Sequence, residues 1–265
     1  MTSIHAGSPL AFAHRGGMAH FPENTLVAFR HAATTGVDGM ESDVWLTADG
    51  VPVLEHDGVV RSWLGIRRRR FSDLPRSSLP ASVPTLADLY ALIEARFALS
   101  LDIKAVDAEE AVRAVLAVAA EVPGARSRLW LAHDKYKESD WRLVASWREL
   151  DPEVRLLDST TVRRFDLPAA QYARRAASAG IDALNLPARE WTPALVEAAR
   201  AAGLACFAFG AQSRPLIDKV VSYGVDAVYS DHLDRLVPAV QVARSRSDRT
   251  DAGHGPEPHD GSADH

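Results

Sequence analysis

Short apolar runs alternate with amphipathic stretches along almost the whole chain, and this alternation narrows the folds that the sequence can adopt. The stretches between the runs, such as Ala108–Val122, space their apolar residues as a helix does. Repeated strand–helix units form parallel sheets covered by helices. We predict eight strands, at Leu10–His14, Gly39–Val44, Ala98–Ile103, Leu129–His133, Val154–Asp158, Ala183–Leu186, Ala205–Phe209 and Ala227–Ser230.

The ends of the predicted helices carry the residues expected there. Thr192-Pro193 is a cap followed by proline at the first helical position, and Gly36, Gly180, Gly203 and Gly224 each close a helix before a strand. The predicted helices are Thr25–Thr35, Leu86–Arg96, Ala108–Val122, Glu138–Leu150, Pro168–Ala179, Pro193–Ala202, Arg214–Tyr223 and Leu233–Arg244.

Eight such units are the number that closes a (β/α)₈ barrel, the TIM barrel. An open doubly wound sheet usually has fewer strands and a glycine-rich first loop, and His14-Arg15-Gly16-Gly17 does not match the G-x-G-x-x-G spacing. A chain of 265 residues is long enough for one barrel. We predict a barrel domain over residues 1–245 and a disordered Ser-, Asp-, Gly- and His-rich tail over 246–265.

A further strand is predicted at Val51–His56, because Asp49-Gly50 between two extended runs is a strong hairpin signal. A two-residue loop would pair Asp43 with His56 across the hairpin, with Glu41 on the same face. Residues 57–84 then form a short excursion. Its run Arg67–Arg70 is interpreted as a solvated basic loop, with attraction of an anionic membrane surface as the alternative.

Composition argues against several classes of partner. The net charge of −5 gives no support to nucleic-acid binding, and no apolar segment approaches the ~20 residues of a membrane span. Residues 1–9 lack a signal-peptide pattern, so we expect a cytoplasmic protein. Cys206 is the only cysteine and lies in an apolar run, which favours a buried structural thiol over a nucleophile. Nothing in the sequence indicates an oligomeric state.

Charged side chains gather where the first predicted strands end, and this is the end of a barrel that carries active sites. Three carboxylates suit a hard divalent cation such as Ca²⁺ or Mg²⁺, and two imidazoles can share general acid and base roles. Two fixed positive charges match the negative charge of a phosphate. The residues are His14, Arg15, Glu41, Asp43, His56, Asp102 and Lys104.

Each of these residues also has a structural interpretation. A lone histidine at a strand end is more often structural than catalytic, and a Glu-x-Asp pair on an edge is usually solvated. Arg15 and Lys104 could be ion-pair partners of the same carboxylates. Their joint occurrence at matching ends of adjacent strands favours a functional site.

Several segments together resemble the glycerophosphodiester phosphodiesterase family. Both their order and their spacing agree with the family pattern, and weaker similarity continues to about residue 240. The segments are His14-Arg15-Gly16, Pro22-Glu23-Asn24-Thr25, Glu41-Ser42-Asp43-Val44, Leu46-Thr47-Ala48-Asp49-Gly50 and His56-Asp57, followed by Val83–Leu86, Leu101–Lys104, Asn185–Pro187 and Gly224–Ala227.

The resemblance implies a barrel enzyme that hydrolyses glycerophosphodiesters to sn-glycerol 3-phosphate and an alcohol. It assigns His14 and His56 as the acid/base pair and Arg15 and Lys104 as phosphate ligands. Glu41, Asp43 and Asp102 would hold one divalent cation. Which histidine is the base stays open, as does whether water or the glycerol 2-hydroxyl is the nucleophile. Asn24 or Thr25 is expected to cap the following helix, with Glu23 ordering the first loop.

The chain departs from the family pattern at three places. Asp102-Ile103-Lys104 stands where Glu-x-Lys is usual, and the shorter carboxylate predicts a weaker cation site. Ala132-His133-Asp134 replaces Ser-Phe-Asp, and Phe209-Gly210-Ala211-Gln212 replaces Trp-Thr-x-Asn. We expect His133 and Phe209 to line the substrate pocket, with a structural role for His133 as the alternative. These changes leave the alcohol that is released open.

Three other functions compete with this one. A lysophospholipase D would need an acyl groove from the excursion, which contains Trp63, Leu64, Ile66 and Phe71. A catalytically silent phosphodiester-binding barrel has no need of two titratable groups beside the phosphate. A sugar isomerase on the same fold has no need of an Arg/Lys phosphate pair.

Overall fold

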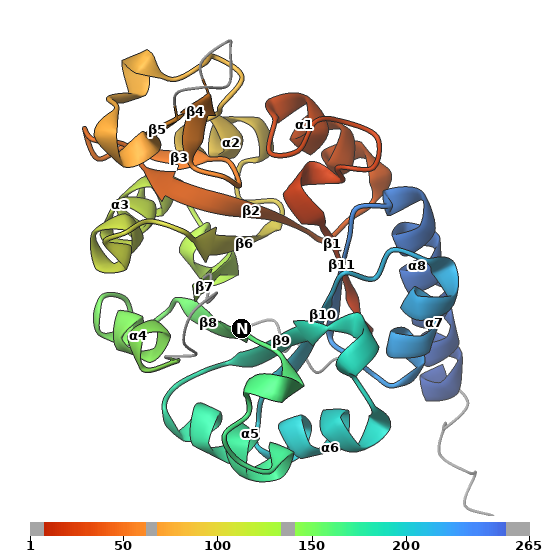
Figure 1. Cartoon of the computed structure of the whole chain (residues 1–265). Coiled ribbons are helices and arrows are strands. Elements are labelled where there is room, and N and C mark those ends of the chain that lie inside the picture. Colours follow the sequence, from red (N-terminus) through yellow and green to blue (C-terminus); the bar gives the residue numbers. More distant parts are fainter. Residues whose placement is uncertain (1–7, 62–67, 134–140, 253–265) are drawn as a thin grey trace, which may run out of the picture.

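The computed structural model describes residues 8–61, 68–133 and 141–252. Eight parallel strands close into a barrel, because β1 pairs with both β2 and β11 (Figure 1). The predicted (β/α)₈ barrel is confirmed, and each predicted strand overlaps an observed one. The barrel strands are β1 (Leu10–Ala13), β2 (Gly39–Leu46), β6 (Ala98–Ile103), β7 (Leu129–His133), β8 (Arg155–Ser159), β9 (Ala183–Pro187), β10 (Ala205–Phe209) and β11 (Ala227–Ser230).

Helices surround the barrel (Figure 1). The side chain of Thr25 accepts a hydrogen bond from the Ala28 N–H, and Thr192 does the same for Leu195, so both caps form as expected. No helix among the described ranges is long and apolar enough to cross a bilayer. The helices are α1 (Leu26–Thr35), α2 (Leu86–Ile93), α3 (Ala108–Ala120), α4 (Trp141–Ser146), α5 (Ala169–Ser178), α6 (Pro193–Ala201), α7 (Arg214–Ser222) and α8 (Leu233–Ala252).

The last helix is longer than predicted. It was expected to end at Arg244, but α8 continues to Ala252. Polar composition alone does not end a helix, and the first glycine after Arg244 is Gly253. The boundary of the proposed tail therefore lies later than residue 245. Residues 253–265 lie outside the described part of the chain, so the disorder of the tail stays a prediction.

The core has two layers that follow the alternation of side chains along each strand. Ala11 and Ala13 pack in the layer between the strands and the helices, whereas Phe12 points into the barrel. Inside the barrel, Phe12 lies 4.8 Å from Tyr229 between ring centroids, and Trp130 lies 4.8 Å from Phe207. The barrel interior is thus a packed core that supports the rim above it.

Cys206 is fully buried in β10. Burial, with a smaller contribution from the charge of Asp226, raises the pKa of its thiol to about 12. The expected burial of the thiol is confirmed, and a thiol that stays protonated is a poor nucleophile.

The predicted hairpin is present, but its register is wrong by one residue. Strand β3 (Pro52–Leu54) runs antiparallel to β2, with Trp45 opposite Val53. Asp43 therefore meets Glu55, whose N–H donates to the Asp43 carbonyl at 3.1 Å, and not His56.

The loop length explains the shift. The turn holds three residues, Ala48–Gly50, between the hydrogen-bonded pair Thr47 and Val51, with Gly50 at a φ of 76°. The Thr47 hydroxyl donates to Asp49 at 2.5 Å and accepts from the Val51 N–H at 3.0 Å, which favours this longer loop. The alignment of Asp43 with His56 does not occur.

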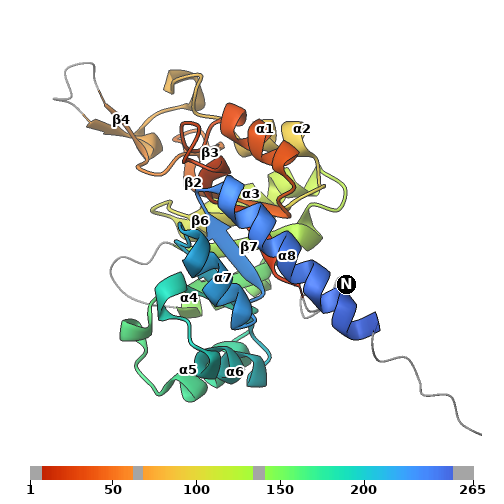
Figure 2. The ribbon, with the colours of Figure 1, turned by 90° about the vertical axis from the view of Figure 1, so that its right-hand side faces the viewer.

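The excursion forms a small antiparallel pair that was not predicted. Strands β4 (Val59–Arg61) and β5 (Arg68–Arg70) stand out from the barrel (Figure 2). Arg68–Arg70 are all exposed, as a solvated basic segment would be, while Arg67 lies outside the described ranges. Phe71 is 2% exposed and packs with Val53 and Leu74 beneath the hairpin. It is therefore not available to line an acyl groove, and Trp63, Leu64 and Ile66 are outside the described residues.

Candidate active site

A pocket of about 370 Å³ opens at the carboxyl ends of the barrel strands. Eight of the nine predicted site residues line it, and Asp43 is not among the lining residues. The pocket also contains groups that were not predicted, chiefly neutral polar side chains from the later strands. The predicted residues that line it are His14, Arg15, Glu41, His56, Asp102, Lys104, His133 and Phe209.

His14 begins a tight turn that directly follows β1. Arg15, Gly16 and Gly17 all have positive φ, of 48°, 83° and 84°. A Cβ at Gly16 would lie 2.8 Å from the Ala28 Cβ, so only glycine lets the turn pack against α1. The turn holds the His14 ring over the rim, where its Nε2 lies 3.7 Å from a Glu41 oxygen.

Asp231 holds the other face of the His14 imidazole. The distance from His14 Nδ1 to Asp231 Oδ1 is 2.6 Å, and Gln212 Nε2 donates to the second oxygen of Asp231 at 2.8 Å. A carboxylate on Nδ1 fixes the ring orientation and leaves Nε2 to face the pocket. Asp231 follows β11 by one residue, so the same strand-end argument that found His14 could have found it.

Burial and charge act against each other at His14 and Glu41. Burial favours the neutral imidazole, but Glu41 and Asp231 together outweigh it and raise the pKa of His14 above its ordinary value. Burial raises the pKa of Glu41 to about 7; Asp43 and Asp102 add to the rise, and His14 opposes it. The protonation of each group therefore affects the protonation of the other.

Asp43 lies behind the pocket in a network of positive charge. Its Oδ1 is 3.2 Å from Lys104 Nζ, and its Oδ2 is 3.0 Å from Arg15 Nε. Asn24 Nδ2 donates to the same Oδ2 at 3.2 Å, and Arg15 Nη1 donates to Glu23 at 2.7 Å. The structural alternative for Arg15 and Lys104, pairing with the carboxylates, is thus present, although both side chains also line the pocket.

The segment around Asn24 is more than a helix cap. Thr25 caps α1, but Asn24 is 2% exposed, has a positive φ of 54° and accepts from the Ser42 hydroxyl at 2.7 Å. Its amide therefore holds β2 and the first loop together beside Asp43. The Arg15–Glu23 contact agrees with the expectation that Glu23 orders the first loop.

His56 reaches the pocket from a bend, because β3 ends at Leu54. The carboxylate of Glu55 accepts from the Gly58 N–H across this bend, and the Trp45 indole donates to the His56 carbonyl at 3.2 Å. His56 Nδ1 lies 3.0 Å from Asp57, a contact that lowers the pKa of Asp57. In both histidines Nδ1 thus lies within hydrogen-bond distance of an aspartate. This leaves Nε2 as the nitrogen that can exchange protons with a substrate.

The later strands supply uncharged polar groups to the pocket. The hydroxyl of Thr160 and the amide oxygen of Asn185 are buried without a hydrogen-bond partner among the described residues. Asn185 Nδ2 donates to the Ser159 hydroxyl at 3.2 Å. Buried polar atoms are normally paired, so these two are candidates to bind hydroxyl groups of a substrate.

A divalent cation fits the carboxylates that face the pocket. Glu41 and Asp102 both line it. Burial is the main cause of the raised pKa of Glu41, and the negative charges of Asp43 and Asp102 add to it; a cation would relieve this added repulsion. The carboxylate oxygens of Asp43, by contrast, already form ion pairs with Lys104 and Arg15 and accept a hydrogen bond from Asn24. Within the described ranges, Glu41, Asp43 and Asp102 do not form a set whose oxygens all lie within 4.8 Å of one another. The role of Asp43 as a ligand therefore stays a prediction.

Comparison with known proteins points to one family. The model of the glycerophosphoryl diester phosphodiesterase family matches residues 14–235. The probable glycerophosphodiester phosphodiesterase 2 of Mycobacterium tuberculosis is 30% identical over 262 residues, covering 92% of this chain and 95% of that protein. Glycerophosphodiester phosphodiesterase 1 of Rattus norvegicus is 58% identical over 50 residues, which are 19% of this chain and 15% of that protein. The chain thus aligns with a small part of the rat protein.

A solved structure shares the fold. A phosphodiesterase from Oleispira antarctica, in complex with the product sn-glycerol-3-phosphate, superposes with a TM-score of 0.75 at 23% identity, covering 90% of this chain and 99% of that one. At this identity the likeness establishes the barrel architecture.

Proposed function

Because the chain belongs to the glycerophosphoryl diester phosphodiesterase family, we propose that it hydrolyses glycerophosphodiesters to sn-glycerol 3-phosphate and an alcohol. The observation that carries the proposal is the pair of imidazoles on one pocket, His14 and His56, each with its Nδ1 on an aspartate. The product bound to the Oleispira antarctica relative supports the same substrate class.

The two histidines are assigned complementary proton transfers. Hydrolysis of a phosphodiester needs a base for the attacking hydroxyl or water and an acid for the departing alkoxide. The carboxylates of Glu41 and Asp231 beside His14 raise its pKa, which favours the protonated ring more than in a free imidazole. We assign the acid to His14 and the base to His56, each acting through Nε2.

The charged half of the pocket binds the phosphate. A divalent cation, Ca²⁺ or Mg²⁺, held by Glu41 and Asp102 with Asp43 behind them, would neutralise charge on the phosphoryl oxygens. Arg15 and Lys104 line the same wall and can donate hydrogen bonds to phosphate, since Asp43 holds their charged groups in position.

The mainly neutral half of the pocket, which Arg164 also lines, binds the glycerol or the departing alcohol. Thr160 and Asn185 offer a hydroxyl and an amide oxygen for hydrogen bonds to hydroxyl groups. His133 and Phe209, at the ends of β7 and β10, supply one polar and one apolar ring. This half therefore selects among glycerophosphodiesters, while the charged half carries out the hydrolysis.

One assay tests the proposal. The purified full chain is incubated with glycerophosphocholine, glycerophosphoethanolamine, glycerophosphoinositol or a lysophospholipid, each with Ca²⁺, Mg²⁺ or a chelator. We expect release of sn-glycerol 3-phosphate from at least one glycerophosphodiester, dependent on the cation. Cleavage of the lysophospholipid alone would replace this function with the lysophospholipase alternative, and no release from any substrate would contradict the proposal.

A further inference from the structure

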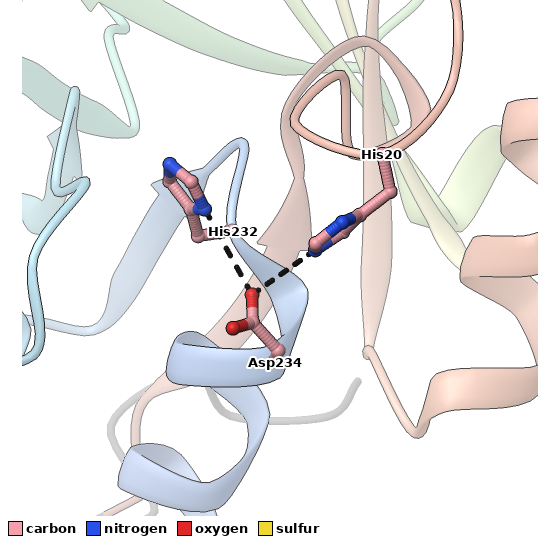
Figure 3. Close-up of side chains that lie close together, drawn as sticks. All are labelled: His20, His232 and Asp234. Atoms are coloured by element: carbon pink, nitrogen blue, oxygen red, sulfur yellow. Dashed lines mark hydrogen bonds and ion pairs between the residues drawn. The ribbon is translucent and has the colours of Figure 1, made fainter.

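A second group of potential metal ligands lies on the barrel rim outside the pocket. His20 and His232 come from the first and last βα loops, and Asp234 lies in the first turn of α8. One ligand atom from each lies within 4.8 Å of the others (Figure 3). Among the described residues, no other group of at least three histidine, cysteine or acidic side chains meets this distance. None of the three lines the pocket.

The three side chains converge on one point. His20 Nε2 is 3.2 Å from Asp234 Oδ1, and His232 Nδ1 is 3.9 Å from the same oxygen (Figure 3). Two ligands around a tetrahedral ion lie about 3.4 Å apart when each bond is about 2.1 Å long. The first distance already matches this separation, and the second needs a movement of about half an ångström, which side chains exposed by 28% to 55% can make.

The backbone around these side chains is well fixed. The Ala19 N–H donates to the Asp231 carbonyl at 3.3 Å, and the His232 N–H donates to the Ser230 hydroxyl at 3.1 Å. A Cβ at Gly17 would lie 2.7 Å from a Leu233 methyl, so the first loop rests directly against the start of α8. The three ligands therefore have a preformed scaffold, which lowers the cost of ordering them around an ion.

One positive side chain lies near the cluster and is compatible with it. Arg235 Nε is 3.9 Å from Asp234 Oδ2, the oxygen that does not face the imidazoles. Arg235 Nη1 donates to the Gln212 carbonyl at 2.7 Å, which directs its charge toward another loop. Asp234 Oδ1 thus stays turned toward the two rings.

We propose that His20, His232 and Asp234 bind a transition-metal ion of the Zn²⁺ type, with solvent completing its coordination. Two imidazoles and one carboxylate suit Zn²⁺, Cu²⁺, Ni²⁺ or Co²⁺, whereas Ca²⁺ and Mg²⁺ prefer all-oxygen sites. The ion would join the loop after His14 to the loop that carries Asp231. It would bind whether or not the pocket is catalytically active.

Calorimetric titration of the full chain with Zn²⁺, in the presence of excess Mg²⁺ to occupy the pocket carboxylates, tests the site. We expect one ion per chain, and at least a tenfold weaker affinity in H20A, H232A or D234N, since each removes one of three ligands. The matched control H31A removes a histidine that contacts Phe21 and lies outside the cluster, and it should bind like the wild type. Equal Zn²⁺ affinity in the wild type and the three cluster variants would overturn the proposal.

Two further measurements keep the test decisive. Electron paramagnetic resonance of the Cu²⁺ form should show two nitrogen ligands in the wild type and one in H232A; a wild-type spectrum without imidazole nitrogen would overturn the site even if a variant failed to fold. The tail carries His254, His259 and His265, so H254A/H259A/H265A serves as a second control. Loss of the ion in this triple variant would assign binding to the tail instead.

Discussion

The two halves of the pocket differ in kind. The half formed by β1, β2, β6 and the bend at His56 carries paired charges, and its groups hold one another through ion pairs such as Asp43 with Lys104 at 3.2 Å. The half formed by β8, β9 and the turn after β8 carries mainly hydroxyl and amide groups, with Arg164 beside them. Two of these neutral groups have buried atoms without a hydrogen-bond partner among the described residues. Charged groups that ion pairs hold in place before substrate binds are suited to stabilising a transition state. Neutral polar groups that are free to form hydrogen bonds are suited to recognising a substrate.

The difference predicts separate kinetic effects for the two halves. Substitutions in the charged half should lower kcat, because they remove groups used in the transition state. Substitutions in the neutral half should raise KM, because they remove contacts that substrate and transition state share. A charged-half variant that changes KM alone would break the comparison.

The largest effect is expected for H14A and H56A. Loss of a general acid or base lowers turnover by roughly 10²- to 10⁴-fold. Steady-state kinetics with the preferred glycerophosphodiester measure the change, and circular dichroism checks that each variant is folded. H31A, on α1, is the matched histidine control. Near-normal turnover by a folded H14A or H56A would remove that residue from the mechanism.

A smaller effect is expected for D231N, because Asp231 acts through His14. Removing a partner that orients a reacting group lowers activity by roughly 10- to 100-fold. Asp231 also helps to raise the pKa of His14, so the substitution should lower that pKa. Titration of the His14 imidazole by NMR in chelator-treated protein measures this shift. An unchanged pKa together with reduced turnover would mean that Asp231 acts only on packing.

The neutral half is tested by T160V, which replaces a hydroxyl by a methyl of similar size. Loss of one hydrogen bond to substrate should raise KM by roughly tenfold with little change in kcat. Stability should stay equal or rise, because the buried hydroxyl has no partner among the described residues. Thermal unfolding and kinetics together measure both effects. A fall in stability at constant KM would make Thr160 a structural residue.

The smallest effect is expected for D102E, which restores the carboxylate length usual in the family. The longer side chain should bind the divalent cation more tightly, by roughly threefold to tenfold. The concentration of Mg²⁺ or Ca²⁺ that gives half-maximal activity measures the change, with wild type in the same titration. If the wild type reached half-maximal activity at a lower cation concentration than D102E, the prediction would be wrong, and the shorter Asp102 would be the better ligand.

Sequence patterns predicted the barrel because local signals mark its elements. Thr192-Pro193 begins α6, and Gly203 follows its last turn with a φ of 83°. The hairpin register was harder to predict than these elements, because Asp49-Gly50 is compatible with loops of two or three residues. The hydrogen bonds of the Thr47 side chain favour the three-residue loop.

The position of a residue type near the end of a strand predicted which side chains share the pocket, while their roles stay predictions. His14 and Asp102 lie at or beside the ends of β1 and β6 and line the pocket, and Glu41 lines it from within β2. Thr160 and Asn185 have side chains that are common in loops and strands of all proteins. Only the three-dimensional packing shows that each has a buried atom without a hydrogen-bond partner in the part of the chain that the structure describes. The Arg68–Arg70 strand escaped prediction because a run of arginines has no apolar alternation.

The contact between His14 and Asp231 joins residues 217 positions apart, which directly follow the first and the last strand of the barrel. The chain is synthesised from its N-terminus onward, so the carboxylate partner of His14 is absent until nearly the entire domain has been made. A nascent or truncated chain that ends before β11 would carry both histidines yet hold one of them without its orienting group. If the proposed function is right, full activity therefore requires that the ring of strands has closed and has brought Asp231 to His14.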